Sequence, residues 1–324
     1  MAPPCQAKGV GDSFDQWRMK IYAVKFIPAY WYSTFYLSPS VLLPCPLDPM
    51  ASTTRTSLVF QHDAKLNQLE TTVILVRPFG DIEELNRQTF KIGGNEDYVV
   101  VTEKTIFHPQ GGGQPCDVGS MIGSTGLIFT VTAVRMDAVY DGQVMHLGNF
   151  KSEDAASSVK TFNSGENIQQ AIDVDKRLLY SRLHTAGHVL GASVRHLVKN
   201  EVKDFAELKA SHFPGAAACE FQGLIDGKWK DAIQQKVDDS IAAKLLVSVE
   251  WWDENEFRRR GLDYMIPDSS LVAPGEKFRV VNIAGLDVYP CGGTHVETTD
   301  LCGRTTVRKI TRKQGQSKIS YSVD

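Results

Sequence analysis

The sequence predicts an α+β protein, in which a small all-β unit precedes a mixed unit of helices and strands. Its length and composition fit a globular chain of about two domains, because 42% of its 324 residues are hydrophobic and 23% are charged. Residues 68–150 carry short β-branched and aromatic runs between glycine turns, whereas residues 175–199 show one strong helical period. We therefore expect an extension over residues 1–49, a β unit over residues 50–150 and an α+β unit over residues 151–324.

The N-terminal segment differs from the rest of the chain. Residues 21–47 are rich in aromatic residues and proline and have neither helical nor strand periodicity. The interrupting prolines make a poor signal peptide, and Asp12 and Asp15 with few arginines make a poor mitochondrial presequence. Met50 begins a stretch that looks like a natural start. We expect residues 1–49 to form a disordered extension outside the folded body.

The β unit is predicted from four short runs and the turns between them. Strands are expected at residues 71–76, 98–101, 121–122 and 127–134, where β-branched and aromatic residues gather. Glycines at 93–94, 111–113, 123–126 and 142 supply turns. Strands this short and this closely spaced favour a small barrel or sandwich.

The second unit combines both kinds of element. We expect a strand at 167–172, a long helix over about 175–199 capped by Asp173 or Asp175, and a short helix at 253–261. A strand is expected at 278–283, followed by a hairpin of residues 307–311 and 318–323. Trp251 and Trp252 are interpreted as core and helix-start packing rather than as a platform for base stacking.

Two separated motifs carry potential metal ligands. His184 and His188 lie four apart on the long helix and so share one face, although a surface pair has the same spacing. Cys291 and His295 flank a Gly-Gly-Thr turn, which lets a thiolate and an imidazole meet on one ion. Together they form a His₃Cys set suited to one Zn²⁺, either structural or with one position opened to water. The alternative is a buried histidine pair and an unrelated turn.

A glycine-rich loop forms the second candidate feature. Residues 108–119 contain Gly112, Gly113 and Gln114, where missing side chains allow backbone amides to approach a ligand. The Gln114 amide could offer a carbonyl and an amine to a water or an ester, which makes it the candidate catalytic group. The alternative is a plain β-turn.

Composition excludes several classes of protein. A net charge of −3 excludes a wholly basic, histone-like chain but allows a local RNA-binding patch. The six cysteines include no CxxC pair, so reduced thiols and a cytoplasmic setting are expected. The sequence contains no run of 18 apolar residues, so no membrane-spanning helix is predicted. GxGxxG and P-loop patterns are absent, so no nucleotide cofactor is expected.

Four motifs together resemble the AlaX family of free-standing editing proteins, which is related to the editing domain of alanyl-tRNA synthetase. The resemblance extends from about residue 68 to the C-terminus and does not account for residues 1–49. It rests on FHPQGGGQPCDVG (107–119), RLHTAGHVLG (182–191), KASHFPGAAACEF (209–221) and YPCGGTHV (289–296).

This resemblance implies a fold, a metal and a substrate. It implies a β-barrel-like first domain, an α+β editing domain and one zinc ion held by the residues that match its ligands, His184, His188, Cys291 and His295. It implies hydrolysis of the ester that joins a wrong amino acid, serine and sometimes glycine, to tRNA(Ala). No aminoacylation domain is recognisable in these 324 residues, so the tRNA is expected to be cleared in trans.

Substrate contacts are predicted at four positions. Gly112 and Gly113 match the family's glycine motif, and Thr185 or Thr294 is hypothesised to hydrogen-bond a serine hydroxyl. Such a site rejects alanine, because its polar groups would be left unpaired. Both threonines also fit ordinary helix and turn positions.

RNA contact is expected from the C-terminal basic residues. Arg308, Lys309, Arg312 and Lys313 lie in a segment after Cys302 whose only acid is Asp324. Given a tRNA substrate, phosphate contact is favoured over a merely solvated hairpin.

Several alternatives remain open. His212 is either an additional catalytic group or a structural residue before a Phe-Pro bend. No acid in the motifs has an obvious role as the base, and a tRNA hydroxyl could assist instead. Editing of another mischarged tRNA such as Ser-tRNA(Thr), and an inactive zinc-stabilised tRNA-binding module, are the alternative functions.

Overall fold

The computed structural model describes residues 55–151, 160–269, 272–273 and 275–324. Residues 1–49, for which a disordered extension was expected, lie outside the described residues. The structure belongs to the α+β class and contains a closed barrel, which confirms the predicted fold class.

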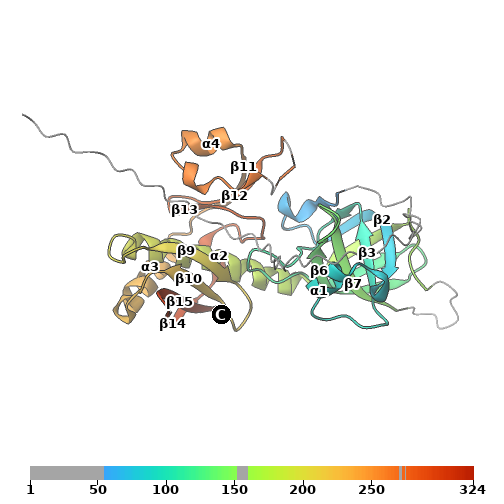
Figure 1. The fold of residues 1–324 in the computed structure, drawn as a ribbon, viewed down its shortest axis with the longest axis horizontal. Coiled ribbons are helices and arrows are strands. Elements are labelled where there is room, and N and C mark those ends of the chain that lie inside the picture. The colour runs from blue at the N-terminus through green and yellow to red at the C-terminus, as the bar shows by residue number, and fades with distance from the viewer. Residues whose placement is uncertain (1–54, 152–159, 270–271, 274) are drawn as a thin grey trace, which may run out of the picture.

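The barrel consists of six antiparallel strands in the order β2-β3-β7-β6-β5-β8 (Figure 1). Its interior is filled by residues such as Val100, Met121 and Phe129, which are almost completely buried. The strands are β2 Gln68–Pro78, β3 Tyr98–Thr102, β5 Gly119–Gly123, β6 Ile128–Met136, β7 Val144–Lys151 and β8 Asn167–Ile172. Helix α1 (Glu84–Thr89) and the parallel pair of β1 (Ser57–Leu58) with β4 (Lys104–Thr105) complete this part.

Strand β8 corrects the expected division of the chain at residue 150. It pairs with both β2 and β5, so it is the strand that closes the barrel. The sequence showed the strand itself but not its partners, because strand pairing depends on residues far apart in the chain.

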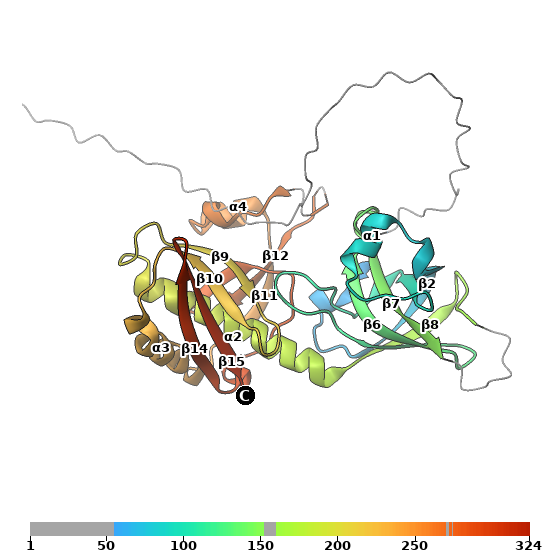
Figure 2. The ribbon, with the colours of Figure 1, turned by 60° about the horizontal axis from the view of Figure 1, so that its bottom comes forward.

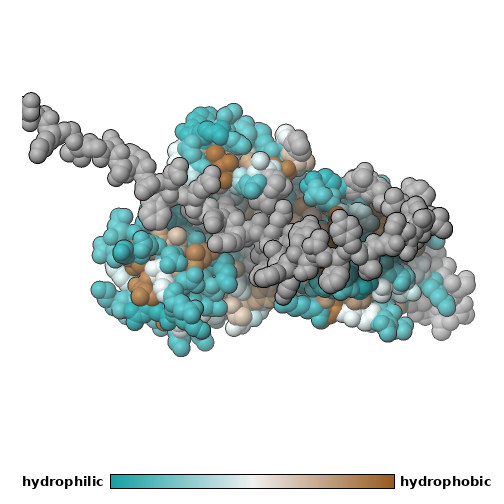
Figure 3. Space-filling view, viewed as in Figure 1, coloured by the Kyte–Doolittle hydropathy of each residue, from teal (hydrophilic) through white to brown (hydrophobic). Residues whose placement is uncertain are grey.

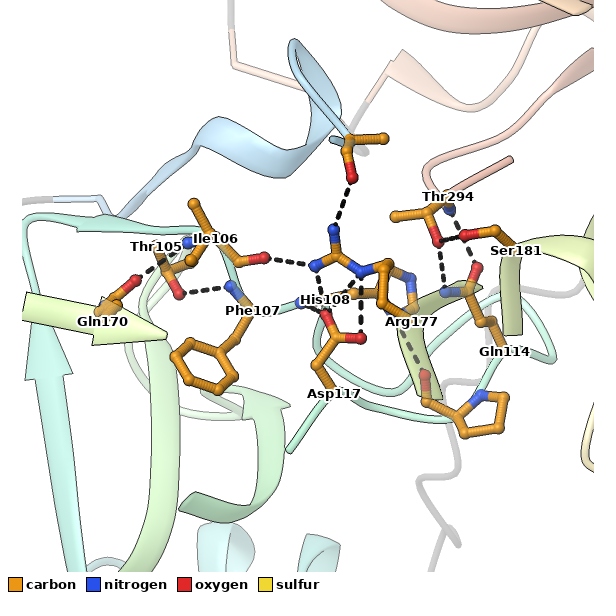
Figure 4. A network of polar contacts seen from close by, with 12 residues as sticks. Thr105, Ile106, Phe107, His108, Gln114, Asp117, Gln170, Arg177, Ser181 and Thr294 are labelled. Carbon is orange, nitrogen blue, oxygen red and sulfur yellow. Dashed lines mark hydrogen bonds and ion pairs between the residues drawn. The ribbon is translucent and has the colours of Figure 1, made fainter. Parts of the chain in front are cut away.

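Helix α2 (Val174–Val198) leads from the barrel into the rest of the molecule (Figure 2). Asp173, rather than Asp175, caps it by accepting a hydrogen bond from the Lys176 amide at 3.0 Å. At the start of α2, Arg177 pairs with Asp117 of the barrel, and both side chains are almost completely buried. The same guanidinium donates to the Ala64 carbonyl, so it joins three segments (Figure 4).

Two further sheets surround α2. The four-stranded sheet has the order β14-β15-β10-β9, and the three-stranded sheet has the order β11-β12-β13. Their strands are β9 Ala206–Ser211, β10 Ala218–Gln222, β11 Val247–Trp252, β12 Phe278–Ile283, β13 Asp287–Pro290, β14 Thr305–Lys313 and β15 Gln316–Val323. Helix α3 (Lys230–Ala242) packs beside α2, and α4 (Glu254–Arg259) follows β11. The expected hairpin and short helix are confirmed as β14–β15 and α4.

The main core lies between α2, α3 and the four-stranded sheet, around residues such as Leu190, Phe221 and Ile233. Trp252 is buried with Phe257 of α4, which agrees with packing at the helix start, whereas Trp251 stacks on His62 at 4.7 Å. None of the helices in the described ranges is long and apolar enough to cross a bilayer.

Candidate metal centre and pocket

Helix α2 presents two imidazoles one turn apart. The rings of His184 and His188 lie 4.9 Å apart between centroids and are inclined by 15°. Gly187 stands between them, and a Cβ atom there would lie 2.4 Å from the His212 ring. A glycine at this position therefore allows a third imidazole to lie against the helix.

The turn after β13 brings the second pair of side chains to the helix. It is held at Cys291, whose amide donates to the Arg279 carbonyl at 3.1 Å and whose carbonyl accepts from the Arg279 guanidinium at 2.5 Å. A Cβ atom at Gly293 would lie 2.3 Å from the His184 ring. Only a residue without a side chain permits so close an approach.

The four predicted metal ligands converge. The donor atoms of His184, His188, Cys291 and His295 all lie within 4.8 Å of one another. The Cys291 sulfur lies 3.4 Å from Nε2 of His184 and 3.4 Å from Nε2 of His295. A tetrahedral zinc with bonds of about 2.3 Å to sulfur and about 2.0 Å to nitrogen would separate these atoms by roughly 3.5 Å. The cluster could therefore hold a metal ion.

Hydrogen bonds set two of the imidazoles in the form that a metal requires. Nδ1 of His184 must donate to the Gln114 amide oxygen at 2.7 Å, because that oxygen also accepts from the Thr294 amide at 3.0 Å. Thr185 gives its hydroxyl proton to the Ser181 carbonyl, so it accepts from Nδ1 of His295 at 3.3 Å. In both rings Nε2 therefore carries the free lone pair and faces the thiol.

The third imidazole independently indicates that the cluster fits a cation. Nε2 of His188 is buried and has no hydrogen-bond partner among the described residues. Burial, reinforced by neighbouring imidazoles, holds the pKa of His184 and His295 well below 6.5 and lowers the pKa of His188 to about 3. All three rings are thus neutral at pH 7, which is the form that coordinates a metal.

The thiol is influenced by opposing effects. Burial raises the pKa of Cys291, whereas the Gly293 amide and the Arg279 guanidinium oppose that rise. A bound cation would favour the thiolate further.

Gln114, Thr185 and Thr294 belong to a buried hydrogen-bond network beside the candidate ligands. All three side chains are completely buried. The Gln114 amide nitrogen donates to the Thr294 hydroxyl at 2.8 Å, so neither end of this amide is free to meet an ester (Figure 4). Gln114, Thr185 and Thr294 therefore hold His184 and His295 in place, and the substrate contact expected of each stays a prediction. Their side-chain direction depends on α2 and the Cys291 turn, which lie far away in the sequence.

An open pocket of about 250 Å³ adjoins the cluster. Its walls are α2, the strands β9 and β10, and the end of β13 with the cysteine turn. The lining includes Gly112 but not Gly113. The Gly113 carbonyl instead accepts from the His212 amide at 2.9 Å, and a Cβ atom there would meet the Ala210 carbonyl at 2.3 Å. Gly113 is therefore a point of close backbone contact between the loop and β9.

His212 lines this pocket beside the metal ligands. Its ring stacks on His184 at 4.3 Å and its Nδ1 lies 2.6 Å from the Tyr321 hydroxyl. That hydroxyl donates to the Leu183 carbonyl, so Nδ1 of His212 is the donor to it. The residue is thus anchored to the fold and placed at the site, and it lies outside the four-donor cluster.

The predicted RNA-binding residues lie on β14. Arg308, Lys309, Arg312 and Lys313 are all exposed, and Arg312 makes an ion pair with Asp226 at 3.3 Å. Hydrophilic residues cover most of this end of the molecule on the face shown in Figure 3. Since β14 is the edge of the sheet whose opposite edge, β9, lines the pocket, about three strand spacings of ~4.8 Å separate them.

Sequence reasoning missed several residues at the site. Glu207, Tyr289 and Arg195 form a polar cluster beside the pocket, and Arg279 holds the cysteine turn. They come from four separate elements. Tyr289 lies in the motif YPCGGTHV (289–296) but was given no role, and the only signal for Glu207 was its position shortly before the motif that contains His212.

Comparison with known proteins agrees with this geometry. A family model described as the threonyl and alanyl tRNA synthetase second additional domain matches residues 278–318, which include the cysteine turn. The alanine–tRNA ligase of Methanosphaera stadtmanae is 26% identical over 253 residues, covering 74% of this chain and 26% of the ligase. That of Methanococcus maripaludis is 28% identical over 228 residues, covering 70% of this chain and 23% of the ligase.

A shorter relative covers more of the chain. The alanyl-tRNA editing protein AlaX-L of Pyrococcus horikoshii is 26% identical over 273 residues, which are 82% of this chain and 56% of that protein. The chain thus spans about a quarter of the ligases and little more than half of AlaX-L. The chain is thus similar both to tRNA synthetases, through this additional domain, and to the AlaX-L editing protein, which agrees with the resemblance that the motifs predicted.

Proposed function

We propose that this chain is an aminoacyl-tRNA deacylase that acts in trans in the cytoplasm and removes serine, and to a smaller extent glycine, from tRNA(Ala). The observation that carries the proposal is the convergence of His184, His188, Cys291 and His295 beside an open pocket. The likeness to AlaX-L supports the choice of substrate.

The protein's own groups would mainly bind and orient the ester. An aminoacyl ester is activated, so positioning and exclusion of the correct amino acid supply much of what hydrolysis requires. Zn²⁺ held by the four donors would supply a Lewis acid for a carbonyl or a water. Gln114 and Thr185 keep two imidazoles in the coordinating form through their Nδ1 hydrogen bonds.

Release of the amino acid is the direct test of this activity. Purified protein should hydrolyse Ser-tRNA(Ala) fastest and Gly-tRNA(Ala) more slowly, and it should spare Ala-tRNA(Ala). Preferential release from Ser-tRNA(Thr) would assign the editing of a different tRNA. Zinc binding without release from any of these substrates would instead indicate a tRNA-binding module.

The metal is tested separately by its content. His188→Ala and Cys291→Ala should each bind less than one zinc per chain, measured by elemental analysis after dialysis against a weak chelator. His196→Ala is the matched control, because this histidine is on the same helix but exposed. Full zinc content in both site variants would contradict the four-ligand centre.

Strand β14 is proposed to contact the tRNA backbone. Alanine at Arg308, Lys309 and Lys313 should weaken tRNA binding and reduce the slope of log K against log salt by about one per lost phosphate contact. Lys91→Ala, an exposed lysine near the barrel, is the control. Unchanged affinity and salt dependence in the triple variant would remove β14 from the interface.

A further inference from the structure

The pocket contains a carboxylate that the metal centre does not use. Glu207 of β9 lines the pocket, and its side chain is 26% exposed. Its Oε1 accepts a hydrogen bond from Nε of Arg195 at 2.7 Å. In the described part of the chain no group donates a hydrogen bond to Oε2. One oxygen of the carboxylate therefore has a hydrogen-bond donor, and the other can accept a hydrogen bond from a molecule in the pocket.

Neighbouring groups hold this carboxylate in place. The Arg195 guanidinium also donates to Asp287 at 3.1 Å and to the Tyr289 hydroxyl at 2.6 Å. With several of its donors used in this way, Arg195 fixes Glu207 but leaves Oε2 free. Burial raises the pKa of Glu207, and Arg195 opposes that rise.

The position of Glu207 relative to the metal ligands follows from the register of α2. A Cβ atom at Gly191 would lie 3.6 Å from Oε2 of Glu207, so the carboxylate stands over that residue. Gly191 lies three residues after His188, which is about 4.5 Å along a helix axis. His188 and Gly191 share one helix face and both line the pocket.

The separation of His188 and Gly191 along the helix suits a ligand whose carbonyl group lies at the metal cluster and whose α-nitrogen lies beside Glu207. The α-nitrogen of an amino acid lies about 2.5 Å from its carbonyl carbon. An ester carbonyl at the metal cluster would thus bring its ammonium within hydrogen-bonding reach of a carboxylate one helix step away. Gly191 has no side chain to fill this space, which the Tyr289 hydroxyl borders as well, 3.2 Å from where a Cβ atom would lie.

We propose that Glu207 is a specificity-determining residue that binds the α-ammonium group of the aminoacyl ester through Oε2. This inference rests on the proposed function and deepens it, because it says which part of the substrate is read beside the carbonyl. The pocket then selects free aminoacyl esters over esters whose α-position carries no positive charge.

The nearest acid in the pocket provides a matched comparison. Glu220 of β10 also lines it, but its carboxylate pairs with Lys209 at 3.4 Å and with Lys318 at 3.5 Å. Glu220 is therefore already neutralised by two lysines, whereas Glu207 has one open oxygen.

The experiment compares Ser-tRNA(Ala) with tRNA(Ala) esterified by glyceric acid, in which a hydroxyl replaces the α-ammonium. Wild-type protein should prefer the serine ester. Glu207→Gln should lower kcat/KM for that ester by about 10- to 100-fold and for the glyceric ester by less than about threefold. Glu220→Gln should leave the ratio of the two substrates unchanged. Glu207→Asp, which keeps the charge, should retain most of the preference.

The possible failures are distinguishable. Equal losses on both esters in Glu207→Gln, or a wild-type protein without preference, would overturn the role of Glu207 while leaving deacylation intact. Hydrolysis of neither ester by the wild type would overturn both proposals. Thermal melting of each variant shows whether a protein that has lost the preference for the serine ester is still folded.

Discussion

At the scale of single residues, Gln114 shows how a buried amide can position a candidate metal ligand without belonging to the four-donor cluster. Its oxygen accepts from His184 and from the Thr294 amide, and its nitrogen donates to the Thr294 hydroxyl. The glycine-rich loop, helix α2 and the cysteine turn therefore meet in one side chain. Ser181 extends the network, with its hydroxyl 2.7 Å from that of Thr294.

Gln114→Leu should weaken zinc binding by about 10- to 100-fold, because Nδ1–H of His184 and the Thr294 amide lose their shared acceptor. Competition with a chromogenic chelator measures the affinity. Gln114→Glu keeps an acceptor and should bind zinc more tightly than the leucine variant. Gln110→Leu in the same loop is exposed and serves as the control. Equal affinities for Gln114→Leu and wild type would refute the positioning role.

The sequence predicted which residues gather at the site better than it predicted what they do. Four ligands could be named because their spacing within each motif already restricts them to one side of a helix or turn. Thr185 or Thr294 was hypothesised to contact the substrate, because a sequence does not show which group forms a hydrogen bond with a threonine hydroxyl. Glu207 was not predicted as a site residue, because its hydrogen-bond partner Arg195 comes from another element.

At the scale of elements, the loop around Gly113 and the strand β9 are fitted closely to each other. Gly113 has a φ of +81° and its carbonyl accepts from the His212 amide. The loop thereby sets the position of His212 as well as that of Gln114.

Gly113→Ala should destabilise the fold by on the order of 1–3 kcal/mol, because the new methyl would meet the Ala210 carbonyl and the backbone angle disfavours a side chain. Urea unfolding gives the change in free energy. Gly111→Ala, whose Cβ would come no closer than 3.8 Å to the Pro109 carbonyl, should have a smaller effect. Similar losses in both variants would speak against the close contact.

The barrel contains a histidine that must stay neutral. His146 is fully buried, its Nδ1 donates to the Val100 carbonyl at 2.9 Å, and its Nε2 lies 2.8 Å from the Thr105 hydroxyl. Because the proton of the neutral ring is on Nδ1, Nε2 accepts from the Thr105 hydroxyl, whose oxygen in turn accepts from the Phe107 amide. Burial lowers the pKa of His146 to about 4.

The folded state should therefore lose stability as the pH falls from 6.5 to 4. In this window the unfolded chain binds a proton at His146 and the folded chain does not, which costs on the order of 3 kcal/mol. His146→Gln should show a shallower decline in unfolding free energy between pH 6.5 and 4.5. His62→Gln, at an exposed position, should retain the wild-type slope. A slope unaffected by His146→Gln would contradict this assignment.

Element prediction succeeded where the buried stripe was long. Helix α2 buries residues along its whole length, including Leu183, Leu190 and Val198, so its period is strong. Helix α3 was not predicted, because its buried positions are only Ile233, Val237 and Ser240 in an otherwise polar segment. Strand β9 was missed for a related reason, since it has no fully buried residue and alternates weakly.

At the scale of the whole molecule, an ion pair joins the barrel to α2 and hence to the candidate metal ligands on that helix. Arg177 donates to both carboxylate oxygens of Asp117 and to the Ile106 and Ala64 carbonyls. Asp117 also accepts from the His108 amide at the start of the glycine-rich loop. The Arg177–Asp117 pair therefore connects the glycine-rich loop to helix α2, and the barrel to the rest of the molecule.

Arg177→Met should lower the free energy of unfolding by about 3–5 kcal/mol, because it leaves Asp117 buried without its charge partner. Arg177→Met combined with Asp117→Asn should recover part of this loss. Lys176→Met breaks only an exposed pair with Asp173 and should cost less than about 1 kcal/mol. Chemical denaturation followed by fluorescence provides all three values. Equal losses for Arg177→Met and Lys176→Met would show that burial of the pair is unimportant.

Among the described residues, β14 is the outer strand of its sheet, and its exposed residues are mostly cationic. Gln234 of α3 hydrogen-bonds to the backbone of β14 only near its start, at Thr305 and Val307. Charges on such an edge repel a second copy of the chain and discourage it from adding its own strand. The arginines and lysines that we propose to contact tRNA would thus also discourage the protein from polymerising. Their removal to weaken tRNA binding would be expected to expose a strand edge prone to aggregation.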